Sequence, residues 1–192
     1  KSLVAALSQN ISKVSINNIT SGKLIISYIE NFPASIDSFC SKDVCIFTDF
    51  NDSIDLSLQS ESFLKQIKRN LLRINYFLFS GDEIDKVKNF INALNLSHKD
   101  LERLDKITFI SHEPKIFRLY NISLSERKWN FILLKTIKNK YYLDSVKTSL
   151  GNGDIFLLLF SYYHDNKRNI INTIHSVSLE LSKIIKPGDL NN

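Results

Sequence analysis

Hydrophobic and polar positions follow a strand-like pattern in much of the second half of the chain. Three segments, 107–110, 116–124 and 130–137, are rich in β-branched and aromatic residues and predict strands. Two more are predicted at 141–147 and at 155–160, where a run that is apolar at every position suits the middle of a sheet. The turns between the last three are too short for parallel crossovers, so the predicted sheet is antiparallel.

Apolar residues recur at intervals of three and four in other segments, which predicts amphipathic helices. The stripes are Leu64, Ile67, Leu71, Ile74 and Leu78; Ile84, Val87, Ile91 and Leu94; and Ile170, Ile174, Val177, Leu181 and Ile184. A short helix opens at Ser97, where Asp100 completes a capping-box pattern.

The N-terminal segment carries a heptad-like stripe. Its apolar positions run from Val4 to Phe32. They fit one long helix that bends near Gly22 as well as two short helices, and the helical segment ends before Pro33. Before the middle helices only 44–47 can form a strand. The predicted fold class is therefore α+β: an antiparallel sheet of about five strands packed by helices, with long N-terminal and C-terminal helices. No linker or repeat interrupts 1–192, which we interpret as a single domain.

Composition and charge narrow the class of protein. A hydrophobic content of 43% is enough to build a buried core and argues against a disordered chain. The net charge of +5 invites a nucleic-acid interpretation, but the basic residues of 65–73 fall on the polar side of a predicted helix. We therefore do not expect nucleic acid as a partner. The sequence contains no methionine, which favours a fragment or a processed product.

The sequence contains no recognisable motif of a catalytic site. We interpret Gly151-Asn152-Gly153 as a turn and not as a phosphate loop, because no lysine and no helix is predicted to follow it. None of the four histidines has the spacing of a zinc ligand. No catalytic residue, cofactor or metal is predicted, and we expect the chain not to be an enzyme. If the fold does gather an active site, its best candidates are Asp49, Asp52, Asp55, His112 and Glu113.

Two interpretations of the cysteines stay open. Cys40 and Cys45 are separated by four residues, a spacing that fits neither a redox motif nor a zinc site. They form either a short loop disulfide in an oxidising compartment or two reduced thiols, one of them packed inside.

The order of a long helix, a helix pair, an antiparallel sheet and a closing helix resembles that of PAS-like extracytoplasmic sensor domains of bacterial membrane receptors, such as sensor histidine kinases. The resemblance is one of layout and involves no signature residues. It implies a ligand-sensing or interaction module in the extracytoplasmic part of a membrane protein, joined to the membrane through segments outside this chain. A homodimer through the terminal helices is also implied.

Within that resemblance, a pocket is expected on the sheet face beneath the middle helices. Aromatic side chains would give it shape and charged ones would pair with a small polar ligand. The residues expected to line it are Arg118, Tyr120, Trp129, Tyr142 and Asp144. The alternative function is a cytoplasmic or host-directed protein-binding adaptor of a pathogen or virus, which reduced cysteines would favour.

Overall fold

The structure, a computed structural model, describes residues 19–32, 35–51, 55–125, 128–141, 152–164 and 169–184. Its centre is a six-stranded sheet in which the strand order follows the chain. The strands are β1 (Gly22–Tyr28), β2 (Val44–Asp49), β3 (Tyr76–Ser80), β4 (Thr108–His112), β5 (Ile116–Ser125) and β6 (Lys128–Lys138). Strands β1 to β4 pair in parallel, and β5 and β6 continue the sheet in antiparallel pairs.

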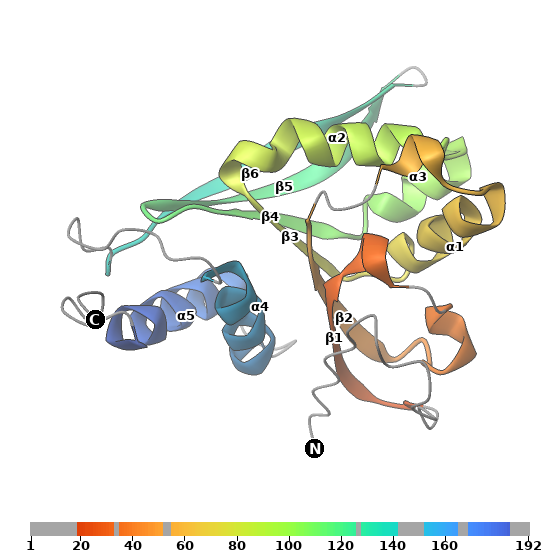
Figure 1. The fold of residues 1–192 in the computed structure, drawn as a ribbon. Coiled ribbons are helices and arrows are strands. Elements are labelled where there is room, and N and C mark those ends of the chain that lie inside the picture. Colours follow the sequence, from red (N-terminus) through yellow and green to blue (C-terminus); the bar gives the residue numbers. More distant parts are fainter. Residues whose placement is uncertain are drawn as a thin grey trace.

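Helices cover both faces of the sheet, α1 to α3 on one and α4 and α5 on the other (Figure 1). Their bounds are α1 (Glu61–Leu71), α2 (Ile84–Ala93), α3 (His98–Leu104), α4 (Asn152–Tyr163) and α5 (Ile170–Ile184), with short 3-10 turns η1 (Ile29–Asn31), η2 (Ile36–Ser38), η3 (Leu56–Leu58) and η4 (Gly81–Glu83). Each face buries its own apolar cluster. Because strand side chains alternate between faces, Ile46 enters the first cluster and Phe47 the second.

The α+β class and several elements of the prediction are confirmed. The predicted strands at 44–47, 107–110, 116–124 and 130–137 correspond to β2, β4, β5 and β6. The stripe beginning at Ile84 forms α2, the short helix expected at Ser97 is α3, and the stripe beginning at Ile170 forms α5. Ser97 caps α3 and forms the predicted capping box with Asp100. These features are set by neighbours in sequence, which a local pattern captures.

The prediction of an antiparallel sheet is wrong, because the sheet is mostly parallel. The error lies in the segment after Leu71, where α1 ends. Ile74 and Leu78 continue the helical spacing by coincidence, yet Leu78 belongs to β3, a strand between β2 and β4 whose three central residues are buried. With β3 in place, α1 becomes a crossover between parallel strands.

Two further elements differ from the prediction. The expected strand at 155–160 is helix α4, because a run that is apolar throughout does not distinguish a buried strand from a buried helix. The expected long N-terminal helix is wrong where it is described, since Ile25 lies in β1 and Ile29 in η1. The rest of that helix and residues 142–147 of a predicted strand lie outside the described residues.

The C-terminal helix is also not the long terminal helix that was expected. With 15 residues, α5 pairs with α4 on the sheet. Across the described part of the chain, no helix combines the length and apolarity needed to cross a membrane. The single-domain interpretation of 1–192 stays a prediction.

Candidate functional site

The carboxyl ends of the four parallel strands meet at one edge of the sheet. β1 ends at Tyr28, β2 at Asp49, β3 at Ser80 and β4 at His112. In α/β sheets, this is the edge where ligands bind, because loops from several strands converge there around a crevice. Polar and ionisable side chains at this edge are therefore the first candidates for a site.

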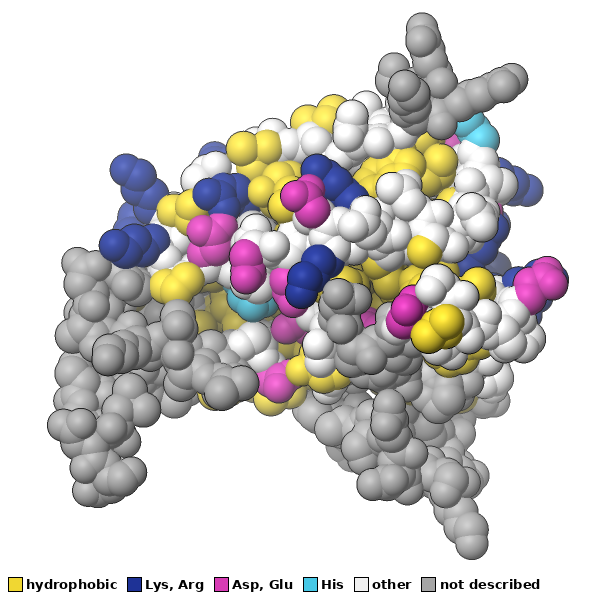
Figure 2. Space-filling model, turned by 45° about the horizontal axis from the view of Figure 1, so that its top comes forward, with side chains coloured by type: hydrophobic (Ala, Val, Ile, Leu, Met, Phe, Trp, Pro, Cys, Tyr) yellow, Lys and Arg dark blue, Asp and Glu magenta, His cyan; other side chains and the backbone are white. Residues whose placement is uncertain are grey.

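Acidic side chains gather at this edge. Asp49 is joined by Glu30 from η1, by Asp82 and Glu83 from η4, and by Asp154 from the first turn of α4. In the space-filling view, acidic side chains lie around a hollow in which a histidine is visible (Figure 2). Burial is the main cause that raises the pKa values of Glu30 and Glu83, and the charge of Asp49 adds to both shifts.

Glu30 is the most deeply buried acid of the group, with 1% of its surface exposed. Its Oε1 accepts a hydrogen bond from the backbone N–H of Asn51 at 2.8 Å, while Oε2 is buried with no hydrogen-bond partner. Burial is the main cause that raises the pKa of Glu30 to about 8, with Asp49 and Glu83 adding to the effect.

Asp82 and Glu83 differ in their ionisation because their surroundings differ. The Ser80 side chain forms a hydrogen bond with Asp82 and is the main cause of its lowered pKa. Burial raises the pKa of Glu83, although its carboxylate accepts the Ser80 N–H at 2.8 Å in a capping box. The edge thus combines carboxyl groups that favour the ionised form and groups that favour the neutral one.

The N-terminus of α4 is packed directly against this edge. A Cβ placed on Gly153 would lie 2.9 Å from Oδ2 of Asp49 and 3.4 Å from Cε1 of His112, so a larger residue could not approach as closely. The ring of Phe156, one turn further along, stacks on His112 with centroids 5.5 Å apart. This packing places Asp154, an exposed residue, beside the strand ends.

The other end of α4 is fixed by a lysine from β1. Lys23 Nζ donates hydrogen bonds to the carbonyl oxygens of Ser161, at 2.6 Å, and His164. A cation at a helix C-terminus satisfies free carbonyl groups and interacts favourably with the helix dipole. Both ends of α4 are therefore held against β1 and β2.

Part of the active-site set suggested by the sequence comes together here. Nε2 of His112 lies 3.6 Å from Oδ1 of Asp49, slightly beyond hydrogen-bonding distance. Glu113 instead forms an ion pair with Arg118. Asp55 is exposed and caps η3. The remaining member, Asp52, lies outside the described residues.

Three of the residues expected to bind a small polar ligand are described, and each has different surroundings. Tyr120 is buried in the apolar cluster, with its ring 6.0 Å from that of Phe79. Trp129 donates its indole N–H to Asn92 of α2 at 3.0 Å, and Arg118 is engaged by Glu113. Tyr142 and Asp144 lie outside the described residues, so the set as a whole stays a prediction.

The two cysteines are free thiols in the structure. Cys40 is buried and Cys45, on β2, is half-buried. Burial raises the pKa of the Cys45 thiol to about 11, which keeps it protonated and unreactive at neutral pH. The disulfide depends on the redox compartment and stays a prediction.

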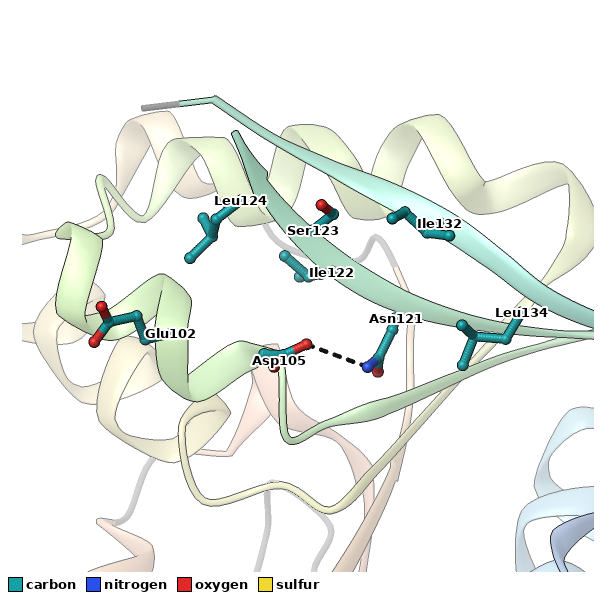
Figure 3. A pocket seen from close by; sticks show the side chains of 8 residues that line it. All are labelled: Glu102, Asp105, Asn121, Ile122, Ser123, Leu124, Ile132 and Leu134. Carbon is teal, nitrogen blue, oxygen red and sulfur yellow. Dashed lines mark hydrogen bonds between the residues drawn. The ribbon is translucent and has the colours of Figure 1, made fainter. Parts of the chain in front are cut away.

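A second hollow of about 400 Å³ lies between α3 and the β5–β6 hairpin (Figure 3). Asn121 points toward Asp105 and donates a hydrogen bond to it at 3.2 Å, while Ile132 and Leu134 form an apolar side. None of the acidic residues of the strand-end cluster lines it. In the described ranges, no three His, Cys, Asp or Glu side chains form a group that could hold a metal ion.

Gly153, Asp154 and Tyr28 were not among the site residues predicted from the sequence. The signal for the first two was present: a glycine-rich turn is followed by an acid and then by Phe156, Leu157 and Phe160 at helical spacing. Once 155–160 is interpreted as a strand, that signal is lost. Nothing local in the sequence marks Tyr28, because its partner Asp154 is 126 residues away.

Comparison with known proteins provides structural neighbours but no sequence family. No protein-family model matches the chain, and no curated protein matches it in sequence. Among solved structures, it is similar to a nucleoside kinase of Methanocaldococcus jannaschii, an archaeal member of the ribokinase family, with a TM-score of 0.52 and 19% identity over 85% of this chain and 49% of that one. The chain thus spans about half the length of that kinase.

Two other similar structures are also kinases. One is pyridoxal kinase of Leishmania donovani, in complex with ADP and pyridoxamine, with a TM-score of 0.42 and 12% identity over 85% of this chain and 60% of that one. The other is fructokinase of Xylella fastidiosa with bound ATP, with a TM-score of 0.43 and 12% identity over 88% of this chain and 56% of that one.

These findings correct the functional expectations drawn from the sequence. The solved structure that shares the fold is a nucleoside kinase of the ribokinase family and not a PAS-like sensor domain, and the sheet is mostly parallel, so the resemblance to receptors is wrong. The ligand-sensing module and the protein-binding adaptor are both abandoned, as is the expectation that the chain is not an enzyme. The extracytoplasmic placement and the expected partners depended on the same resemblance and are withdrawn with it. A homodimer stays a prediction.

At the level of fold, the chain is similar to about half of a ribokinase-type kinase.

Proposed function

We propose that this chain contributes the phosphate-handling part of a kinase that transfers the γ-phosphoryl group of ATP to a hydroxyl group of a small molecule. The observation that carries the proposal is the position of the α4 N-terminus. Gly153 lets this helix approach Asp49 at the carboxyl edge of the parallel strands, and Asp154 follows immediately. The fold shared with a nucleoside kinase supports the same class of reaction.

A helix N-terminus suits the charge that moves during phosphoryl transfer. Its first backbone N–H groups have no partner within the helix, and the helix dipole adds partial positive charge at that end. Phosphate groups bind at such sites for both reasons. With 12 residues, α4 is long enough for this effect. Donors fixed in advance stabilise the negative charge of the transferring group without reorganisation.

Asp154 is the residue proposed to act as general base. As the acceptor hydroxyl oxygen bonds to the γ-phosphorus, its proton passes to the Asp154 carboxylate, the bond to the β-phosphate oxygen breaks, and ADP leaves. Asp154 is exposed, so an acceptor can reach it, and its place in the first turn of α4 brings it to the phosphate-binding end. General bases of this kind contribute about 10²- to 10⁴-fold to the rate.

The acceptor is proposed to be a neutral, hydroxylated molecule. The carboxylates of Asp49, Asp82 and Asp154 at the strand ends would repel an anionic acceptor and can accept hydrogen bonds from hydroxyl groups. A nucleoside, fructose and pyridoxamine are the first acceptors to examine. The similar structures are a nucleoside kinase, a fructokinase and a pyridoxal kinase in complex with pyridoxamine.

An acceptor screen tests the reaction class. The purified chain is incubated with MgATP and each acceptor in turn, and ADP formation is compared with the rate without acceptor. We expect one acceptor to raise ADP formation well above that background. Equal rates with and without every acceptor would contradict the proposed transfer.

A further inference from the structure

Strand β1 carries a β-bulge next to the candidate site. Ile26 pairs with Thr48 of β2, but the next pair in register joins Tyr28 to Asp49, so Ser27 has no partner. Bulges occur preferentially next to active sites, where the extra residue redirects a side chain. The bulge in β1 lies at the last pair before the strand ends, beside the acidic edge.

The bulge changes which side chain faces α4. Ile25 enters the apolar cluster beneath α4 and α5, and Ile26 enters the cluster on the other face. A regular strand would therefore direct Ser27 toward α4 and Tyr28 away from it. With Ser27 bulged out of register, Tyr28 takes the position opposite Asp49, whose Oδ2 faces Gly153 of α4.

In that position Tyr28 reaches the proposed base. Its hydroxyl donates a hydrogen bond to Oδ1 of Asp154 with an oxygen–oxygen distance of 3.4 Å. Burial and the negative charges of Asp154 and Asp49 raise the pKa of Tyr28 to about 12. The phenol therefore remains protonated, and remains a donor, at any pH at which an enzyme of this kind would work.

We propose that Tyr28 is a positioning residue, whose hydroxyl holds Oδ1 of Asp154 so that Oδ2 remains available for the proton of the acceptor. The inference rests on the proposed function. A carboxylate in the first turn of a helix can adopt several rotamers, and a single donor on one oxygen selects among them. A proton acceptor must lie within hydrogen-bond reach of the hydroxyl that it deprotonates, so this selection affects the rate of transfer more than nucleotide binding.

The first test removes the hydroxyl and keeps the ring. We expect Tyr28→Phe to lower kcat about 2- to 10-fold, the loss that corresponds to one hydrogen bond, while KM for MgATP stays unchanged. Tyr162→Phe is the matched control, because Tyr162 lies on α4, the helix of Asp154, with 73% of its surface exposed. Its kcat should equal that of the wild-type chain.

The second test does not depend on activity. Urea unfolding is measured for Tyr28→Phe, Asp154→Asn and the double variant. If the two side chains interact, the midpoint of the double variant falls by less than the sum of the two single shifts. Additive midpoints, or a Tyr28→Phe chain with wild-type kcat, would overturn the positioning role. A wild-type chain that phosphorylates no acceptor would overturn the proposed function, and the role of Tyr28 in transfer with it, whereas the unfolding cycle would still decide whether the contact exists.

Discussion

Glu30 places a carboxyl group in the interior at the end of β1, where one of its oxygens has no partner. Its pKa is raised from 4.5 to about 8, mainly by burial. Between these two values the unfolded chain has released the proton and the folded chain still holds it, so the free energy of unfolding falls as pH rises. The stability is fully present below pH 4.5 and is lost by the time pH has passed about 8.

Glu30→Gln tests this linkage, because an amide keeps the shape and does not titrate. At pH 5 we expect the variant and the wild-type chain to be similar in stability. At pH 8.5 we expect the variant to be more stable, by an amount on the order of 4 kcal/mol at most. Urea unfolding at the two pH values measures the difference, with the exposed Glu61→Gln as control. Parallel pH dependences of wild type and Glu30→Gln would refute the interpretation.

At the scale of elements, α4 decides both the packing and the site. Its buried residues Phe156, Leu157 and Phe160 lie at helical intervals, and Leu158 points outward with 44% of its surface exposed. The same helix therefore docks on the sheet through one face and presents its N-terminus at the strand ends. Lys23 at the far end keeps that orientation.

The variants Phe160→Ala and Leu158→Ala test whether residues 155–160 form the helix seen in the structure or the strand predicted from the sequence. Phe160 is fully buried among Phe47, Phe156 and Tyr76, so its removal should cost about 3 to 5 kcal/mol in the free energy of unfolding. Removal of Leu158, which is partly exposed, should cost less than about 1.5 kcal/mol. Because both residues would face the same side of a strand, equal losses in urea unfolding would argue against the helix.

At the scale of the whole molecule, sequence patterns predicted the elements that depend on neighbouring residues. They did not predict the contacts between residues far apart in the sequence. The capping box of Ser97 and Asp100, strands β4 to β6 and helix α5 depend on residues close in sequence, and each was predicted from them. The parallel order of β1 to β4 depends on crossovers, and it was lost when β3 was assigned to a helix. Asp49 and His112 were selected as candidates, but their proximity required the sheet to bring the ends of β2 and β4 to one edge.

The site itself was predicted only in fragments. Asp154 and Tyr28 lie 126 residues apart, and a register shift in β1 decides that they meet. No periodicity in either segment carries that information, because a bulge depends on the pairing of two strands. The glycine before Asp154 was identified, yet its purpose, close approach to Asp49, becomes visible only with β2 in place.

The most direct measurement of the central claim is the rate of phosphoryl transfer from MgATP to the best acceptor by wild type, Asp154→Asn and Asp43→Asn. Asp43 is an exposed control that precedes β2, at the opposite edge of the sheet from Asp154. The account predicts that Asp154→Asn lowers kcat about 10²- to 10⁴-fold with little change in KM for MgATP, and that Asp43→Asn matches the wild-type chain. Transfer by Asp154→Asn at the wild-type rate would contradict it.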